Sequence, residues 1–284
     1  MRRPLRSAMP GFLAKVTLAA MLLGWANPLS AADLLDEVRS KGELLVGTSN
    51  DAPLSFVDPQ TQQAAGVLPD ILREFLVRAG VKAELHIVAM PFNSLIPSIQ
   101  SSRIQLIGDA MYVRPARQEV IDFTNVTFYN PESLDVSPGN PKGLHALADL
   151  CGRVAGSYQG TTYIDQLRQA STKCPAGKPI DIRQYPTIQN VLADLSAGRL
   201  DAAVVDGSLS AYALKQNPDL KFELVAEYRP EDKRSSNCAF GVAKGSPAFI
   251  HAFNETYAAM RSDGTAARIF EKWGLVPTAF FLEP

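Results

Sequence analysis

Residues 43–48 read ELLVGT, residues 68–79 read LPDILREFLVRA and residues 83–89 read AELHIVA, and this succession decides the fold. The middle stretch places apolar side chains at helical spacing, with Pro69 in the first turn and Gly80 directly after the last one, as is typical of a helix with those ends. The flanking stretches are short and apolar, as strands are. Strand, helix and strand in succession predict an α/β unit with helices packed on a largely parallel sheet.

The same alternation extends in both directions along the chain and then starts again. The first run adds helices at 34–38 and 94–100 and a strand at 104–107. The second run contains strands at 153–155, 181–183 and 202–205 and helices at 163–170 and 187–197. A last segment contains a strand at 240–243 and helices at 248–262 and 265–273.

Two stretches rich in Pro, Gly and polar residues separate the runs, namely 131–143 (PESLDVSPGNPKG) and 228–237 (YRPEDKRSSN), and we interpret them as linkers. The first run is incomplete without the last segment. The chain is therefore expected to leave one lobe, build a second lobe and return. Two crossings imply a hinge and a cleft between the lobes, and clefts of this kind bind ligands.

The first 32 residues have the order of a secretory signal peptide. Arg2 and Arg3 begin a basic leader, residues 16–26 (VTLAAMLLGWA) are apolar, and residues 30–32 are small. The apolar run is shorter than the ~20 residues that a membrane-spanning helix needs. No Cys stands at the cleavage position, so a lipid anchor is not expected. We expect a signal peptide at 1–32 and a free periplasmic protein.

The charge of the chain excludes one large class of partner. The net charge is −1, and the leader carries basic but no acidic residues, so the chain without its leader is more acidic still. Nucleic-acid binding requires a basic face. No nucleic-acid partner is therefore expected.

Three cysteines are present in a chain that is expected to enter an oxidising compartment. Cys151 and Cys174 bracket a short segment, so they form either a disulfide, which is favoured, or two free buried thiols. Cys238 has no partner nearby in the sequence and is interpreted as a small strand residue.

Four segments give the chain a resemblance to the family 3 extracellular solute-binding proteins of ABC importers, and their order and spacing agree over nearly the whole chain after the leader. These segments are 46–56 (VGTSNDAPLSF), 92–120 (FNSLIPSIQSSRIQLIGDAMYVRPARQEV), 154–162 (VAGSYQGTT) and 197–212 (AGRLDAAVVDGSLSAY). Within the amino-acid-binding type, the sequence resembles the ectoine and hydroxyectoine branch.

The resemblance implies a fold, a mechanism and a partner. The fold is the type II periplasmic-binding-protein fold, with a discontinuous lobe 1 at 33–130 and 232–284, and a lobe 2 at 131–231 that includes the hinge crossings. A small zwitterionic or cationic amino-acid-like ligand, either a polar or basic amino acid or an ectoine-type solute, binds in the cleft and is delivered to an ABC permease. The chain is expected to be a monomer with no cofactor and no metal.

The resemblance also assigns the carboxylate end of the ligand. Arg117, at the start of a helix, matches the family residue that clamps the carboxylate, and a guanidinium does this with two parallel hydrogen bonds. From the second lobe, Thr161 and Thr162 at a helix N-terminus complete the carboxylate site, with Gln159 beside them. Thr161 could equally act as the helix cap, and the two roles are compatible.

Asp206 matches the residue that accepts hydrogen bonds from the ligand's ammonium group. It follows the strand at 202–205, where ligands of open α/β sheets bind. Capping of the next helix is the alternative role. Ala110, which follows the strand at 104–107, belongs to the same set of expected ligand contacts.

The stretch beginning at Asn50 departs from the commonest family pattern, since Asp51 stands where many members carry an aromatic residue. In the ectoine branch the acid meets a cationic ring that aromatic faces enclose. Phe92 and Tyr112 fall at two positions of that cage, or they belong to ordinary core packing. Leu54 falls at a third position, where an aromatic residue is expected.

Asp109 stands where family members carry a small neutral residue. If it faces the cleft, then Asp51, Asp109 and Asp206 oppose the single cation of Arg117. Unpaired buried carboxylates are costly. This charge count predicts a ligand with additional positive charge.

Two other functions remain open. A periplasmic dehydratase of the cyclohexadienyl type would use carboxylates in the same cleft, and a ligand-sensing protein would dock on a membrane receptor. No metalloprotease, nucleophile-elbow or P-loop motif is present, and His86, His145 and His251 are scattered. We therefore predict a binding protein rather than an enzyme.

Overall fold

The computed structural model describes residues 33–230 and 236–281. The predicted signal peptide lies outside these described residues. Within them, no helix combines the length and the apolar character needed to cross a membrane.

Lobe 1 is built on a mixed five-stranded sheet with the strand order β4-β1-β5-β14-β6. The strands are β1 (Glu43–Thr48), β4 (Glu84–Ala89), β5 (Leu106–Ile107), β6 (Asp122–Phe123) and β14 (Gly241–Val242). The first three strands of the sheet pair in parallel, whereas β14 runs antiparallel to both of its neighbours. β14, from the C-terminal part of the chain, thus pairs with strands from the N-terminal part.

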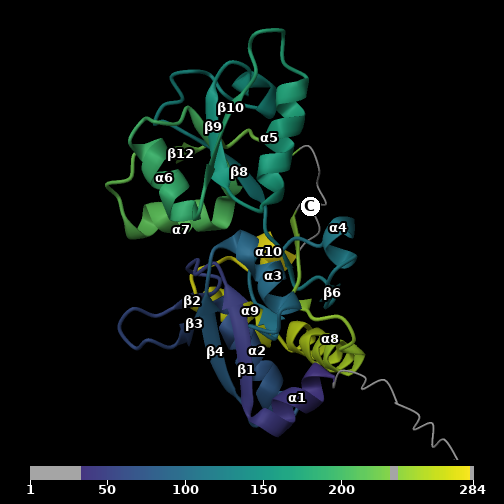
Figure 1. The fold of residues 1–284 in the computed structure, drawn as a ribbon. Helices are drawn as coiled ribbons and strands as arrows, with labels where there is room; N and C mark the ends of the chain where they lie inside the picture. Colours follow the sequence, from purple (N-terminus) through teal and green to yellow (C-terminus); the bar gives the residue numbers. More distant parts are fainter. Residues whose placement is uncertain (1–32, 231–235, 282–284) are drawn as a thin grey trace, which may run out of the picture. The chain divides into compact units, whose positions relative to one another are not determined.

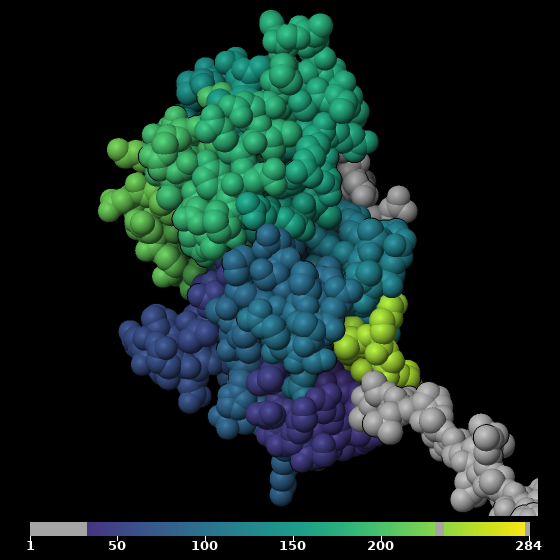
Figure 2. All heavy atoms as spheres, in the orientation of Figure 1, coloured from purple at the N-terminus to yellow at the C-terminus, as the bar shows by residue number. Residues whose placement is uncertain are grey.

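The helices of lobe 1 come from both ends of the chain, shown in purple to blue and in yellow (Figure 1). From the N-terminal part come α1 (Leu34–Lys41), α2 (Val67–Arg78), η1 (Phe92–Ser94), α3 (Leu95–Gln100) and α4 (Pro115–Gln118). From the C-terminal part come α8 (Pro247–Ser262), α9 (Thr265–Lys272) and α10 (Thr278–Phe281). The hairpin of β2 (Phe56–Val57) and β3 (Ala64–Ala65) carries an exposed tip, which stands out in dark blue in Figure 2.

Aromatic side chains join α2 to α8 in the core of lobe 1. The ring of Phe75 lies 5.3 Å from that of Phe249 and 5.4 Å from that of Phe253, and Phe240 lies 5.0 Å from Phe253. These edge-to-face contacts bury large apolar areas and add about 0.5–1.5 kcal/mol per pair beyond burial. They fix the C-terminal helices on lobe 1.

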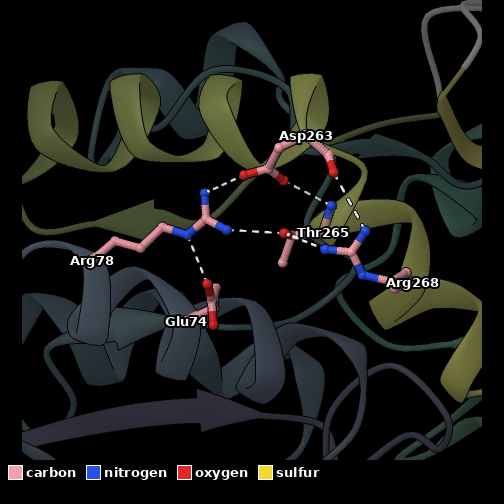
Figure 3. Close-up of polar contacts among 5 residues, drawn as sticks. All are labelled: Glu74, Arg78, Asp263, Thr265 and Arg268. Carbon is pink, nitrogen blue, oxygen red and sulfur yellow. Dashed lines mark hydrogen bonds and ion pairs between the residues drawn. The ribbon is translucent and has the colours of Figure 1, made fainter.

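A polar cluster repeats this connection at the surface (Figure 3). Arg78 of α2 donates to Glu74, to Asp263 and to the hydroxyl of Thr265, at 2.7, 2.7 and 2.9 Å. Arg268 donates to the same hydroxyl at 2.8 Å. Because these groups are exposed, each pair contributes at most about 1 kcal/mol. The cluster therefore fixes the register of α2 against α9 rather than supplying much stability.

Lobe 2 carries the second five-stranded sheet, with the order β10-β9-β11-β8-β12. Its strands are β8 (Glu132–Val136), β9 (Val154–Tyr158), β10 (Asp181–Tyr185), β11 (Ala202–Asp206) and β12 (Glu223–Leu224). Its helices are η2 (Leu147–Leu150), α5 (Thr162–Thr172), α6 (Ile188–Ser196) and α7 (Gly207–Gln216). The predicted α/β class and the two sheet-containing lobes are confirmed.

The interpretation of 131–143 as a linker is wrong over its first half. Residues 132–136 form β8, which is buried and lies between β11 and β12. Its polar side chains find partners inside the lobe: Glu132 accepts from Tyr228 at 2.5 Å, and Asp135 accepts from Ser210 at 2.5 Å. Burial raises the pKa of Asp135 to about 7. The polar residues of this segment show no strand pattern in the sequence, because their hydrogen-bond partners lie far away along the chain.

The chain crosses between the lobes along a pair of antiparallel strands, β7 (Phe128–Tyr129) and β13 (Asn237–Cys238). The second expected linker therefore ends in a strand. Cys238 lies buried in this pair with a free thiol, which agrees with its interpretation as a small strand residue. The hinge expected at these crossings stays a prediction.

Cys151 and Cys174 form the favoured disulfide, with a separation of 23 residues. Closing a loop of this length in the unfolded chain stabilises the fold by about 3 kcal/mol. The bond holds the end of α5 against the segment that leads into β9.

Candidate functional site

A small cavity lies where the carboxyl ends of β9 and β11 meet α4 and the loop after β5. Its volume is about 10 Å³, which is at the lower limit for a single water molecule. The lining residues come from both lobes, and they are Phe92, Ala110, Tyr112, Arg117, Tyr158, Thr161, Thr162, Tyr163 and Asp206. A ligand larger than water therefore requires these side chains, and the lobes that carry them, to move apart.

Arg117 reaches from α4 towards lobe 2. Its Nη1 donates to the carbonyl oxygen of Tyr112 at 2.9 Å, and its Nη2 donates to that of Gly160 at 3.0 Å. The guanidinium lies 5.5 Å from the centroid of the Phe92 ring. Burial lowers its pKa, and the charge of Arg114 lowers it further. Among the described residues no carboxylate pairs with this cation, so the site is electrostatically suited to an anionic group.

Thr162 opens α5 and faces the same cavity. Its Oγ1 is buried and has no hydrogen-bond partner in the described part of the chain. Thr161 behaves differently, because its Oγ1 donates to the carbonyl oxygen of Tyr158 at 2.8 Å and does not cap the helix. The Thr162 hydroxyl and the positive end of the α5 dipole are thus left to an incoming oxygen.

Replacing Thr162 with valine removes this hydroxyl at nearly constant shape. We expect the Kd for a carboxylate ligand to rise about tenfold, because one charge-assisted hydrogen bond is lost. The melting temperature should stay the same, since the hydroxyl has no hydrogen-bond partner among the described residues. Thr161→Val is the matched control, because it breaks a formed bond and should lower the melting temperature. Isothermal titration that finds Kd for Thr162→Val within twofold of wild type would refute this role.

The loop before α5 approaches lobe 1 closely because residue 160 is glycine. Gly160 has φ +83°, and a Cβ there would lie 2.8 Å from the Cα of Asn93. Gln159 accepts a hydrogen bond from Asn93 Nδ2 at 3.1 Å. Gln159 therefore bridges the lobes beside the cavity and does not line it.

Asp206 lies buried at the end of β11, and no Lys, Arg or His among the described residues forms an ion pair with it. Its Oδ1 accepts from Asn130 Nδ2 at 2.7 Å and from the Tyr163 hydroxyl at 2.9 Å, and its Oδ2 accepts from the Tyr158 hydroxyl. It makes no side-chain capping bond to α7. Burial raises its pKa to about 6, and the two tyrosines counteract part of that rise. Asp206 is thus poised to ionise when a cation arrives.

Four aromatic rings stand around this carboxylate and the cavity. The Phe92 and Tyr158 rings are 5.7 Å apart, those of Tyr112 and Tyr163 are 5.9 Å apart, and all meet edge to face. Aromatic rings around a buried carboxylate form a favourable environment for a cation. Leu54, the third expected cage position, is instead buried in the core of lobe 1.

Asp51 and Asp109 form a second acidic group beside the cavity, joined by Ser49. The Ser49 hydroxyl lies 2.5 Å from Asp51 Oδ2 and 2.7 Å from Asp109 Oδ2. One hydroxyl has one proton to donate, so the second contact requires a proton on a carboxyl group. Burial raises the pKa of Asp51 to about 7, and the charge of Asp109 contributes to the rise. Burial also raises the pKa of Asp109.

Neither acid lines the small cavity. Asp109 accepts from the backbone amides of Ser49 and Ala110, at 2.5 and 2.7 Å, and so turns towards its own lobe. Asp51 accepts from Gln189 Nε2 of lobe 2 at 2.9 Å. A carboxyl pair that holds one proton is less negative than two free carboxylates, which weakens the simple charge count made from the sequence.

Four residues of this arrangement receive no role from the sequence: Tyr158 lies inside the segment 154–162, and Tyr163, Asn130 and Gln189 lie outside the four motif segments. Tyr158 and Tyr163 look like core aromatics of a strand and a helix, and Asn130 and Gln189 are single polar residues. The pairing of β8 with β11, in the register Glu132↔Asp206, brings Asn130 beside Asp206. In the described part of the chain, no three His, Cys, Asp or Glu side chains gather as metal ligands.

Known proteins resemble this chain in sequence and in fold. The L-cystine-binding protein TcyJ of Escherichia coli strain K12 is 26% identical over 269 residues, which cover 94% of this chain and 95% of that protein. An ancestral arginine-binding protein, solved with arginine bound, is 26% identical with a TM-score of 0.72 over 82% of this chain and 98% of its own.

A second solved structure is the precursor of an enzyme. It is an ancestral amino-acid-binding protein, AncCDT-1, a precursor of cyclohexadienyl dehydratase. It is 24% identical, with a TM-score of 0.72 over 85% of this chain and 99% of its own, and shows the shared fold alone. The model of the bacterial extracellular solute-binding proteins, family 3, matches residues 44–276, and the chain belongs to that family.

Proposed function

We propose that this chain is the periplasmic substrate-binding component of an ABC importer for a small zwitterionic or cationic amino-acid-like ligand. One observation carries the proposal: the partly buried Arg117 cation, without a carboxylate partner among the described residues, lies in one cavity with the orphaned Thr162 hydroxyl and with Asp206. A small molecule that carries both an anion and a cation can pair with Arg117 and Thr162 at one end of the cavity and with Asp206 at the other. Polar and basic amino acids and ectoine-type solutes have this form.

Binding is proposed to proceed by closure. The ligand first engages Arg117 and the aromatic rings of lobe 1. Rotation about β7 and β13 then brings Thr162 and Asp206 onto it. The ligand favours the closed form only by binding it better than the open form. A permease then recognises that form, and the carrier acts as a monomer after its signal peptide has been removed.

A thermal-shift screen of the chain without its leader tests this function. The panel contains L-arginine, L-lysine, L-histidine, L-cystine, ectoine, L-leucine and L-glutamate. At 100 times Kd a ligand stabilises the fold by about 2.7 kcal/mol, which raises the melting temperature by several degrees. We expect this for a polar or cationic compound. Preference for leucine or glutamate would overturn the ligand class.

A periplasmic dehydratase is the second candidate. The observation that favours it is the pair of buried carboxyls, Asp51 with a pKa of about 7 and Asp206 with a pKa of about 6, because an acid catalyst needs a pKa near the working pH. Incubation with prephenate separates the two functions. Turnover establishes the enzyme, whereas binding of the panel compounds without turnover supports the carrier.

A further inference from the structure

A second pocket of about 430 Å³ lies between the turn of lobe 1 at 50–59 and the helices α6 and α7 of lobe 2. Its volume falls in the range of ~300–1,000 Å³ typical of small-molecule sites. The walls are mainly apolar and include Phe56, Ile188, Leu192 and Leu209. Neither the sequence motifs nor the contacts of the Arg117 cavity account for this pocket.

One hydrogen-bonded pair connects the two spaces. Asp51 and Gln189 line the apolar pocket and are bonded to each other across the lobes at 2.9 Å. On the other side, the Ser49 hydroxyl joins Asp51 to Asp109, at 2.5 and 2.7 Å, and Asp109 accepts from the backbone amide of Ala110, which lines the Arg117 cavity. The Asp51–Gln189 pair therefore lies between the polar cavity and the apolar pocket.

The lining residues change in character from the Arg117 cavity, past the Asp51–Gln189 pair, to the apolar pocket. Arg117 and Thr162 suit a carboxylate, and Asp206 suits an ammonium group. Asp51 offers a further acceptor at the passage, and beyond it the walls are leucine, isoleucine and phenylalanine. A ligand that complements all of these groups in order has an amino-acid head, a nitrogen in the middle of its side chain and an apolar end.

We propose that the pocket is a second subsite, which takes the apolar or aromatic end of an elongated cationic amino acid whose side-chain cation replaces Gln189 as the hydrogen-bond partner of Asp51. This inference rests on the proposed function of the Arg117 cavity. It makes the distal substituent of the ligand a determinant of affinity. Because both lobes line the pocket, a substituent held there also favours closure.

Two probes test the subsite: L-lysine and Nε-benzyl-L-lysine, which keeps the side-chain cation and adds one ring. Burial of the ring predicts about tenfold tighter binding of the benzyl compound to the wild-type protein. Ala213 of α7 lines the pocket, and Ala213→Phe should abolish this advantage while leaving the Kd for L-lysine unchanged. Ala211, exposed on the same helix, lies outside the pocket, and Ala211→Phe should keep the advantage.

A second substitution that fills the pocket keeps the test valid if Ala213→Phe does not fold. Gln216 is exposed and lines the pocket, so Gln216→Trp should fold normally and reduce the advantage of the benzyl compound. Equal affinity of the two probes for the wild-type protein would overturn the subsite alone. An advantage that persists in both filling variants would do the same. If neither L-lysine nor any other compound of the screening panel binds, the proposed function fails together with the subsite.

Discussion

Arg117→Ala should weaken the binding of a carboxylate ligand by more than about 100-fold. The substitution removes both hydrogen bonds of a bidentate pair and leaves the ligand's carboxylate buried without a counter-charge, which costs about 3–5 kcal/mol. Arg117→Lys should restore only part of the affinity, because an ammonium is a point charge without the planar fork. Isothermal titration with the strongest ligand of the screening panel measures both losses.

The fold should survive this change. Among the described residues, Arg117 donates its hydrogen bonds to the backbone carbonyls of Tyr112 and Gly160, so the melting temperature should fall by no more than about 4 °C. Arg103→Ala, at an exposed position, serves as the control and should bind like wild type. A Kd for Arg117→Ala within about threefold of wild type would show that the carboxylate binds elsewhere.

Affinity for a cationic ligand such as L-arginine should rise about 500-fold between pH 5 and pH 7. Asp51 and Asp206 have pKa values raised to about 7 and about 6, mainly by burial, and a ligand cation pairs only with the ionised groups. Below the higher pKa, each pH unit reduces the ionised fraction about tenfold. Asp109, Ser49, Gln189 and Asp206 are the groups that face Asp51, and L-arginine itself keeps its charge across this range.

The same pKa values determine whether the ligand-free protein becomes more or less stable as the pH rises. A carboxyl whose pKa is raised in the folded protein stabilises the fold below its ordinary pKa, and this contribution is lost as the pH rises through 6 and 7. The ligand-free protein should therefore melt at a lower temperature at pH 8 than at pH 5, while its ligand affinity changes in the opposite direction. Asp51→Asn should flatten the affinity profile to roughly the tenfold change due to Asp206. A wild-type affinity independent of pH would refute the protonated carboxyl pair.

The lobes and much of the cavity can be predicted from the sequence because short-range patterns encode them. Helical spacing identifies α2, and family motifs place Arg117, Thr162 and Asp206, all of which line one cavity in the structure. These residues stand at strand ends and helix starts, which local sequence defines well. Their contacts with a ligand remain a prediction.

The rest depends on contacts between distant residues, which no local pattern encodes. β8 is polar in sequence and buried in structure because Tyr228 and Ser210 complete its hydrogen bonds. Asn130 and Gln189 belong to the site only because they donate hydrogen bonds to the carboxylates of Asp206 and Asp51, which lie 76 and 138 residues away. The orientation of Asp109 could not be predicted for the same reason.

Matched titrations of amino acids and their decarboxylated amines show whether the cleft binds a carboxylate. The pairs are L-arginine with agmatine, L-lysine with cadaverine and L-histidine with histamine, each measured calorimetrically at pH 8. The account predicts saturable binding of at least one amino acid and binding of its amine that is weaker by about 100-fold or more. An amine that binds as tightly as its amino acid would contradict the assignment of this cleft to a carboxylate-bearing ligand.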